Sequence, residues 1–256
     1  MSQNMFLKGC SLESKDVLKD IYNKAFLSDK TRKSIYTEKF YTPNILNYIN
    51  KLDKYFDIDI VTYGIFEESE RKIVCFNLKD LDEVPIVLMK ISYNSKFQTL
   101  KHKDFLGALM SLGIKREKMG DVLLKEDICY VPVFRELYDY IKLNLTHIAK
   151  TPCIIEKVDL KTQVIPEFNF KKILIRVSSN RIDSIVSSLC NVSRSKALQF
   201  ISQGKVLLNY NQTLKKDKDV TKHSVIVIRG YGKFKMVEKV GFTSKGKLKI
   251  LFKKFI

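Results

Sequence analysis

The stretch from Arg181 to Asn209, RIDSIVSSLCNVSRSKALQFISQGKVLLN, constrains the fold more than any other part of the chain. Its first apolar residues recur at the i, i+3, i+4 and i+7 spacing of a helix with one buried face: Ile182, Ile185, Val186 and Leu189. Ser193 is a preferred N-cap residue and predicts the start of a second helix, which Gly204 would end in a left-handed conformation. A strand over 205–209 would follow directly. The pattern predicts a helix, a loop, a second helix and a strand in close succession.

Two cations, Arg194 and Lys196, occupy the first turn of the predicted second helix. The backbone amides already give a helix N-terminus positive charge, so cations there cost roughly a few tenths of a kcal/mol. Lys196 even stands at the third helical position, where a capping Glu would help. A bound anion between the two cations would explain the placement, and a nucleic-acid phosphate is the obvious anion.

The positive charge of the chain is concentrated in its last third. From Ile165 to the end there are 20 Lys and Arg against 5 Asp and Glu, whereas the first 164 residues hold 26 and 23. A general excess of lysine would not produce this asymmetry. It is the distribution expected of a nucleic-acid-binding module joined to a more neutral part.

The cysteines and histidines do not form a metal-site pattern. The cysteines are odd in number and widely spaced, which indicates reduced thiols that serve in packing: Cys10, Cys75, Cys129, Cys153 and Cys190. No histidine stands at zinc-site spacing, so we expect no metal and no cofactor. The opening MSQNMFLKGC lacks the apolar core of a signal peptide, and no apolar run approaches the roughly 20 residues that span a bilayer. We therefore expect a soluble, cytoplasmic protein without membrane insertion.

The part before the basic module predicts two further domains, which gives a multidomain α+β fold. Residues 1–82 read as an N-terminal mixed α/β unit whose strands would span 58–66 and 72–78. Residues 83–160 read as a ferredoxin-like βαββαβ domain, with strands at 85–93, 121–124, 128–133 and 152–158 and helices at 103–112 and 135–149. A linker at 161–172 would lead to a C-terminal domain at 173–256, made of the helix-loop-helix and a β-sheet.

Many RNA-recognition domains share the order predicted for the middle domain. They stack bases on exposed aromatic residues within one strand, whereas the matching strand here, ICYVPV, offers only Tyr130. The topology is suggestive, but an RNA surface on this domain is not established by its residues.

The stretch RGYGKFK in the C-terminal domain combines cations with an aromatic residue. Strand alternation would place Arg229, Tyr231, Lys233 and Lys235 on one face, with Phe234 on the other. Such a face suits single-stranded or loop RNA, because phosphates meet the cations while an unstacked base lies on the tyrosine. An edge strand protected by charge is the alternative interpretation.

The basic module resembles the S-four RNA-binding domain, named after the ribosomal small-subunit protein. The matching residues are Arg181, Ile182 and Asp183, then Ser193, Arg194 and Ser195, then Ala197, Gly204, Val206 and Asn209. The resemblance implies a surface that grips structured RNA, with the phosphates near Arg181, Ser193, Arg194, Lys196 and Lys205. Asp183 would orient a neighbouring cation or cap a helix.

The middle of the chain carries a second resemblance. KFQTLKHKDFLGALMSLGIKREKMGDV, from Lys96 to Val122, is similar to the RNA-binding domain of YlmH-type proteins, which join it to a C-terminal S-four domain. RGYGKFK also resembles their R-G-x-G-R-F run, with Lys233 in place of the usual Arg. The resemblance implies a non-enzymatic factor that binds rRNA and tRNA on the large ribosomal subunit in ribosome-associated quality control.

The predicted RNA-binding residues are therefore Arg181, Ser193, Arg194, Lys196, Lys205, Arg229, Tyr231, Lys233 and Lys235, and no catalytic residue is predicted. One alternative is an RNA-modifying enzyme of the pseudouridine synthase type, but its motif G-R-L-D-x-x-T-x-G is matched only by Arg181 and Asp183. The other is a basic structural protein of the membrane or of cell division. Membrane-surface anchors are usually amphipathic helices, whereas the cations here fall on predicted strands and one helix end.

Overall fold

The computed structural model describes residues 3–7, 12–49, 51–94, 96 and 98–255. The chain divides into two compact units, Met1–Glu167 and Phe168–Ile256. This boundary lies inside the segment predicted as a linker. The finer division into four segments stays a prediction. Helices and strands contribute in similar measure, which agrees with the α+β class.

The N-terminal part of the first unit packs helices on a small sheet. Its helices are α1 (Gln3–Phe6), α2 (Leu12–Thr31) and α3 (Pro43–Ile49), followed by the 3-10 turn η1 (Leu52–Lys54). The antiparallel sheet has the order β1 (Ile35–Tyr36), β3 (Ile73–Phe76), β2 (Ile60–Tyr63). Strands β2 and β3 end earlier than predicted. Ile65 and Asn77, which follow them, have positive φ angles of 71° and 47° that turn the chain out of the sheet.

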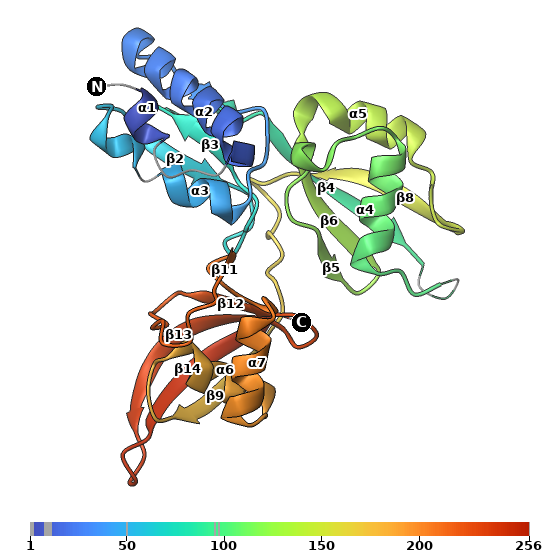
Figure 1. Cartoon of the computed structure of the whole chain (residues 1–256). Helices are drawn as coiled ribbons and strands as arrows, with labels where there is room; N and C mark the ends of the chain where they lie inside the picture. Colours follow the sequence, from blue (N-terminus) through green and yellow to red (C-terminus); the bar gives the residue numbers. More distant parts are fainter. Residues whose placement is uncertain (1–2, 8–11, 50, 95, 97, 256) are drawn as a thin grey trace. The chain divides into compact units, whose positions relative to one another are not determined.

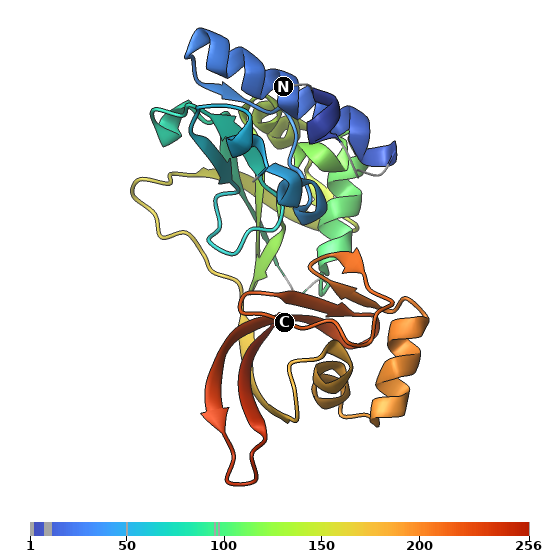
Figure 2. The same ribbon diagram turned by 60° about the vertical axis from the view of Figure 1, so that its left-hand side comes forward.

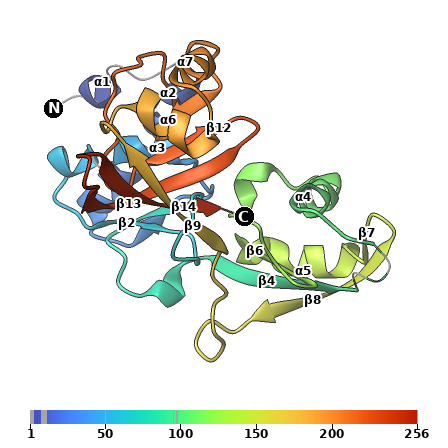
Figure 3. The ribbon, with the colours of Figure 1, turned by 90° about the horizontal axis from the view of Figure 1, so that it is seen from below.

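The rest of the first unit is an antiparallel sheet with two helices on one face. After η2 (Leu81–Glu83) come β4 (Ile86–Tyr93), α4 (His102–Ser111), η3 (Arg116–Lys118), β5 (Leu123–Lys125), β6 (Ile128–Phe134), α5 (Arg135–Asn144), β7 (His147–Ile148) and β8 (Thr151–Val158). The strand order is β5-β6-β4-β8-β7. Both helices lie on the same side of β4 and β8 (Figure 3), and their apolar residues share one core with alternate residues of the strands.

The prediction of a helix over 135–149 is wrong for its last turn. Helix α5 ends at Asn144, and His147 and Ile148 pair with Pro152 and Thr151 as a short strand. The apolar spacing misled the prediction because Ile148 is buried in the same core that a longer helix would have reached. Burial alone does not distinguish the two conformations.

Within the first unit, the segment KREKMGDV connects the two sheets. The carboxylate of Asp121 accepts hydrogen bonds from the backbone N–H groups of Glu70 (2.6 Å) and Arg71 (2.9 Å). The Arg116 guanidinium donates to the carbonyls of Met119 (2.7 Å) and Gly120 (2.9 Å), and its burial lowers its pKa to about 10. The Asp121 contacts hold the loop between α4 and β5 against the residues just before β3, and the Arg116 contacts close the loop on itself.

The second unit is a six-stranded antiparallel sheet with α6 (Ile182–Cys190) and α7 (Arg194–Ser202) on one face (Figures 1 and 2). Its strands are β9 (Phe170–Val177), β10 (Val206–Leu208), β11 (Asn211–Gln212), β12 (Val225–Ile228), β13 (Gly232–Phe242) and β14 (Leu248–Phe255), in the order β11-β10-β12-β13-β14-β9. Strand β9 begins inside the predicted linker, because Phe170 already pairs with Phe255.

Both ends of α7 are as the sequence predicts. The Ser193 hydroxyl accepts a hydrogen bond from the Lys196 N–H (3.3 Å), as an N-cap does. Gly204 has a φ of 67°, and the Lys205 N–H donates to the carbonyl of Phe200 (2.9 Å), which is the six-to-one bond of a Schellman motif. The predicted roles of Ser193 as a cap and of Gly204 as the left-handed helix end are confirmed.

Candidate nucleic-acid interface

The carboxylate of Asp183 holds two arginines at the start of the helix pair. Asp183 lies in the first turn of α6 and its side chain is only 1% exposed. Arg194 contacts its Oδ2 through Nε (2.9 Å) and Nη2 (2.8 Å), and Arg181 contacts both carboxylate oxygens at 3.2 and 3.3 Å. The Arg194 side chain stays 53% exposed. One buried anion therefore orients two guanidinium groups that still reach solvent.

The pKa of Asp183 follows from these contacts. Burial by itself would raise the pKa of the carboxyl, but hydrogen bonds from Arg194 and Arg181 outweigh it and lower the pKa below its ordinary value. The carboxylate is therefore charged at neutral pH, and the ion pairs with both arginines persist.

This network corrects the argument that Arg194 needs an external anion. Asp183 already supplies a negative partner, because α6 packs beside α7 and brings the carboxylate to the first turn of the second helix. The pattern within α7 could not reveal a partner from another helix. For Lys196, whose ammonium group lies 5.9 Å from the centroid of the Phe200 ring, contact with a bound anion stays a prediction.

Phe200 gathers three predicted residues around one ring. The Nζ atoms of Lys196 and Lys205 lie 5.9 and 5.8 Å from its centroid, and the ring of Tyr231 lies 5.6 Å away at 47°. Tyr231 remains 36% exposed. Sequence reasoning missed Phe200; its position one turn after Lys196 on a helix was the available signal. We call the set Arg181, Ser193, Arg194, Lys196, Lys205 and Tyr231 the α7 cluster.

The predicted single face of RGYGKFK is wrong in its first half. Ile228 to Tyr231 form a turn closed by a hydrogen bond from the Tyr231 N–H to the Ile228 carbonyl (2.9 Å), and Gly230 and Gly232 have φ angles of 87° and 117°. Arg229 lies in this turn, with its N–H bonded to the carbonyl of Lys205 (2.9 Å). Alternation starts only in β13, so Arg229 and Tyr231 do not continue the row of the later lysines.

Lys233 and Lys235 lie apart from the α7 cluster. Their neighbours Phe234 and Met236 are buried in the core beneath α6 and α7. The side chains of Lys233 and Lys235 therefore emerge on the opposite face of the sheet. The Nζ atom of Lys233 there lies 3.6 Å from the centroid of the Phe255 ring.

The sheet that contains β6 offers few exposed aromatic side chains on which a base could stack. Tyr130 is partly exposed on the face away from α4 and α5, opposite Lys90, whose ammonium group pairs with Glu156 (3.1 Å). Toward the end of β6, Pro132 and Phe134 are buried, and the Phe134 ring packs on Phe40 at 5.3 Å. Among the described residues of β6, Tyr130 is the one aromatic side chain with an accessible surface on this face.

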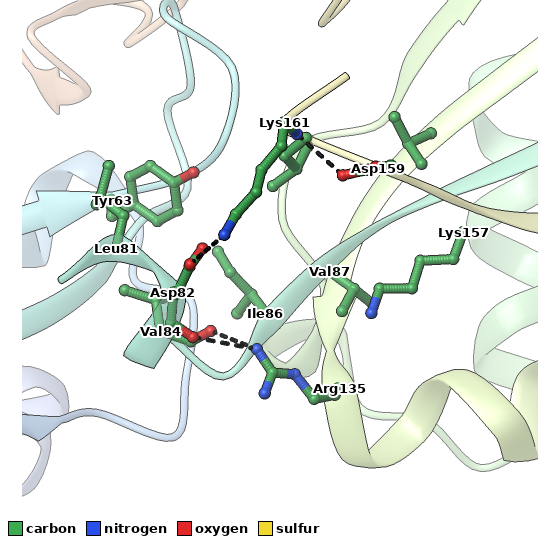
Figure 4. A pocket seen from close by; sticks show the side chains of 12 residues that line it. Tyr63, Leu81, Asp82, Val84, Ile86, Val87, Arg135, Lys157, Asp159 and Lys161 are labelled. Carbon is green, nitrogen blue, oxygen red and sulfur yellow. Dashed lines mark hydrogen bonds and ion pairs between the residues drawn. The ribbon is translucent and has the colours of Figure 1, made fainter. Parts of the chain in front are cut away.

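A cavity of about 350 Å³ lies beside β4 and β8 (Figure 4). Two of its charged side chains make contacts there: Lys161 contacts Asp82 at 2.5 Å, and Arg135 donates to the carbonyl of Val84 at 3.3 Å. The lining residues include no Cys, Ser, Thr or His.

Two observations concern the thiols and the acidic residues of the described ranges. Burial raises the pKa of Cys75 to about 12 and that of Cys190 to about 11, so both thiols stay protonated; Cys10 lies outside the described residues. Within the described ranges, no three His, Cys, Asp or Glu side chains gather as a metal ion would require. In the same part of the chain, no helix has the length and apolar character needed to cross a membrane.

Comparison with known proteins places the chain in a class that carries an RNA-binding domain. Residues 80–162 match the family model described as "Putative RNA-binding domain in YlmH". This stretch contains the β5-β6-β4-β8-β7 sheet with α4 and α5. The chain therefore contains a YlmH-type RNA-binding domain.

Two relatives extend the likeness beyond this domain. The "Ribosome-associated protein quality control protein P2" of Bacillus subtilis (strain 168) is 27% identical over 202 residues, which cover 77% of this chain and 79% of that protein. The solved structure of "Cell division protein ylmH from Streptococcus pneumoniae" matches with a TM-score of 0.51 at 21% identity, over 62% of this chain and 98% of that one. The second match shows the fold alone. Together with the domain match, the first shows homology to YlmH-type proteins.

Proposed function

We propose that the protein is a non-enzymatic, cytoplasmic RNA-binding factor that binds structured RNA, namely rRNA and tRNA on the large ribosomal subunit, in ribosome-associated quality control. The observation that carries the proposal is the α7 cluster, in which Asp183 orients Arg181 and Arg194 beside the capped N-terminus of α7. The RNA-binding domain at 80–162 and the name of the Bacillus subtilis relative support the same assignment.

The chemistry of the cluster suits phosphate groups. A guanidinium is a planar fork that can bind a carboxylate on one side and a phosphate on the other, and a fixed fork loses less entropy on binding. Lys196 and Lys205 add two point charges next to Phe200. Tyr231 is exposed enough to accept an unstacked base, and Arg229 lies in the adjoining turn.

We also propose a ferredoxin-like architecture for residues 83–160 and an S-four-like architecture for 173–256. The strand order β5-β6-β4-β8 supports the first, because a βαββαβ chain in the split arrangement places its first and third strands in the centre. Two short helices joined by a tight turn and followed by a sheet support the second. Residues 1–82 and the linker 161–172 complete the proposed division.

The burial of Asp183 supports a non-enzymatic role. The pseudouridine synthase alternative would assign this residue to the aspartate of its catalytic motif. In this chain the carboxylate is bound by two guanidinium groups and by the Ser184 N–H (2.9 Å), so it lacks the access that a substrate base would need. Its contacts are those of a positioning residue.

The test is co-sedimentation of the full chain with large ribosomal subunits. Lys196→Glu with Lys205→Glu should remove the protein from that fraction while leaving Asp183 and both arginines intact. Lys15→Glu with Lys19→Glu, at exposed positions of α2 in the first unit, makes the same charge change outside the unit that carries the cluster and should leave co-sedimentation unchanged. Wild-type sedimentation only with small subunits, free tRNA or membranes would refute the ribosomal assignment.

A further inference from the structure

The strands β13, β14 and β9 present a basic face on the side opposite α6 and α7. The residues that alternate inward along these strands are buried beneath the two helices: Phe234, Met236, Ile250, Phe252, Ile175 and Val177. The intervening positions carry the cations of the outer side: Lys233, Lys235, Lys249, Lys253, Lys172 and Arg176. Both helices of this unit lie on the other side of the sheet (Figure 2). We call this outer side the open face.

The strand register sets these cations directly opposite one another. Lys235 pairs with Lys253, and Lys253 pairs with Lys172, so three lysines form a row across three strands. Lys249 pairs with Arg176 in a second row. Like charges at directly opposed positions destabilise a sheet, because their Cβ atoms are only about 5 Å apart. The same placement would suit a ligand with closely spaced negative charges.

Two aromatic rings contact lysine ammonium groups on the open face. Phe170 and Phe255 pack edge to face with centroids 4.8 Å apart. The Nζ atom of Lys253 lies 4.9 Å from the Phe170 centroid, and that of Lys233 lies 3.6 Å from the Phe255 centroid. Cation–π contacts of this kind keep the ammonium groups near the sheet. Among the described residues of the three strands, Glu238 is the single carboxylate side chain.

We propose that the open face binds the phosphate backbone of a second RNA segment, separate from the segment at the α7 cluster. The inference rests on the proposed function in that its ligand is RNA. A row of three cations spans two strand spacings, about 10 Å in all, and so offers successive charges to a polymer with regularly spaced phosphates. The Phe170 and Phe255 pair lies next to this row, where bases of the same strand would pass.

The experiment measures the affinity of the full chain for a labelled RNA hairpin with a single-stranded tail, at several salt concentrations. Replacing Lys172, Lys235 and Lys253 together by Gln should lower the affinity at least about tenfold and reduce the slope of log affinity against log salt by about 2 to 3, one counterion for each lost phosphate contact. Replacing Lys15, Lys19 and Lys33 together by Gln removes the same charge from exposed positions of the first unit and should change the slope far less.

Several outcomes separate this inference from the proposed function. Equal slopes for the two triple variants would overturn it. In one outcome, Lys196→Glu with Lys205→Glu abolishes RNA binding while the open-face variant binds as the wild type does. That result would support RNA binding at the α7 cluster and refute RNA binding at the open face. The reverse result assigns RNA to the open face and removes it from the cluster. Unchanged RNA binding together with lost binding to phosphatidylserine vesicles would assign the open face to membranes instead.

Two further measurements cover a variant that fails to fold. Lys172→Arg, Lys235→Arg and Lys253→Arg together keep the charge and should keep the slope of the wild type. In the wild type, ultraviolet crosslinking to the same RNA should yield adducts on peptides that contain Phe170 or Phe255. Adducts confined to residues 181–231 would contradict the inference.

Discussion

The guanidinium of Arg194 lies 2.8 Å from the carboxylate of Asp183, which ties the first turn of α7 to the first turn of α6. Asp183 is buried whereas the arginine is half exposed, so the ion pair has one face inside the protein and one face in solvent. A cation at a helix N-terminus is thereby stabilised from within the fold. The same contact fixes the direction in which the guanidinium can meet a ligand.

Asp183→Asn should destabilise the protein and weaken RNA binding together. The substitution leaves two guanidinium groups without their anion, and loss of a charged hydrogen-bond partner at a buried site costs about 1 to 3 kcal/mol. Urea unfolding measures the free-energy change, and filter binding measures the affinity. Asp217→Asn, at an exposed position in the loop before β12, is the matched control and should change neither quantity.

The stabilising effect of Asp183 should disappear in acid. Its pKa in the folded protein lies below the ordinary value of 3.8, so its contribution is complete above that value and is lost as the pH falls through the lower folded pKa. The difference in unfolding free energy between the wild type and Asp183→Asn should therefore be constant from pH 7 down to about 5 and shrink below about 4. A difference that grows in acid would contradict the ion-pair assignment.

Arg194→Glu and Lys196→Glu should change stability in opposite directions, although both remove a cation from the same turn. Glu at position 194 would meet the buried Asp183 carboxylate and lower the melting temperature. Glu at position 196 would complete a capping box with Ser193 and suit the helix dipole, a gain of about 0.3 to 1 kcal/mol. Both should weaken RNA binding, so calorimetry and binding measurements together distinguish structural from functional loss.

Gly204→Ala should cost more stability than Gly246→Ala. Both glycines have a φ near +70°, which costs an L-residue about 1 kcal/mol. At Gly204, however, a Cβ atom would also collide with the side-chain amide of Gln212, whereas at Gly246 there is open space. The difference in melting temperature between the two variants isolates that contact. Equal losses would mean that Gln212 moves away freely.

The local signals in the sequence were sufficient for the two ends of α7. A cap and a left-handed glycine act within a few residues, so Ser193 and Gly204 could be assigned from their neighbours alone. The Asp183 contact with Arg194 joins two helices across 11 positions, and no local pattern encodes it. The positive φ angles at Gly230 and Gly232 broke the alternation that was extended from Lys233 back to Arg229.

The hydrogen bonds of Asp121 in the first unit determine where the chain can be cut into fragments that fold. The similarity to the YlmH-type domain begins at residue 80, yet Asp121 is held by the backbone of Glu70 and Arg71, and Phe134 packs on Phe40. Removing residues 1–79 would leave a carboxylate without its N–H donors and uncover an aromatic ring. The start of the matched domain is thus not the start of an independently folding part, and a fragment cut at residue 80 is expected to aggregate more than one that keeps residues 1–79.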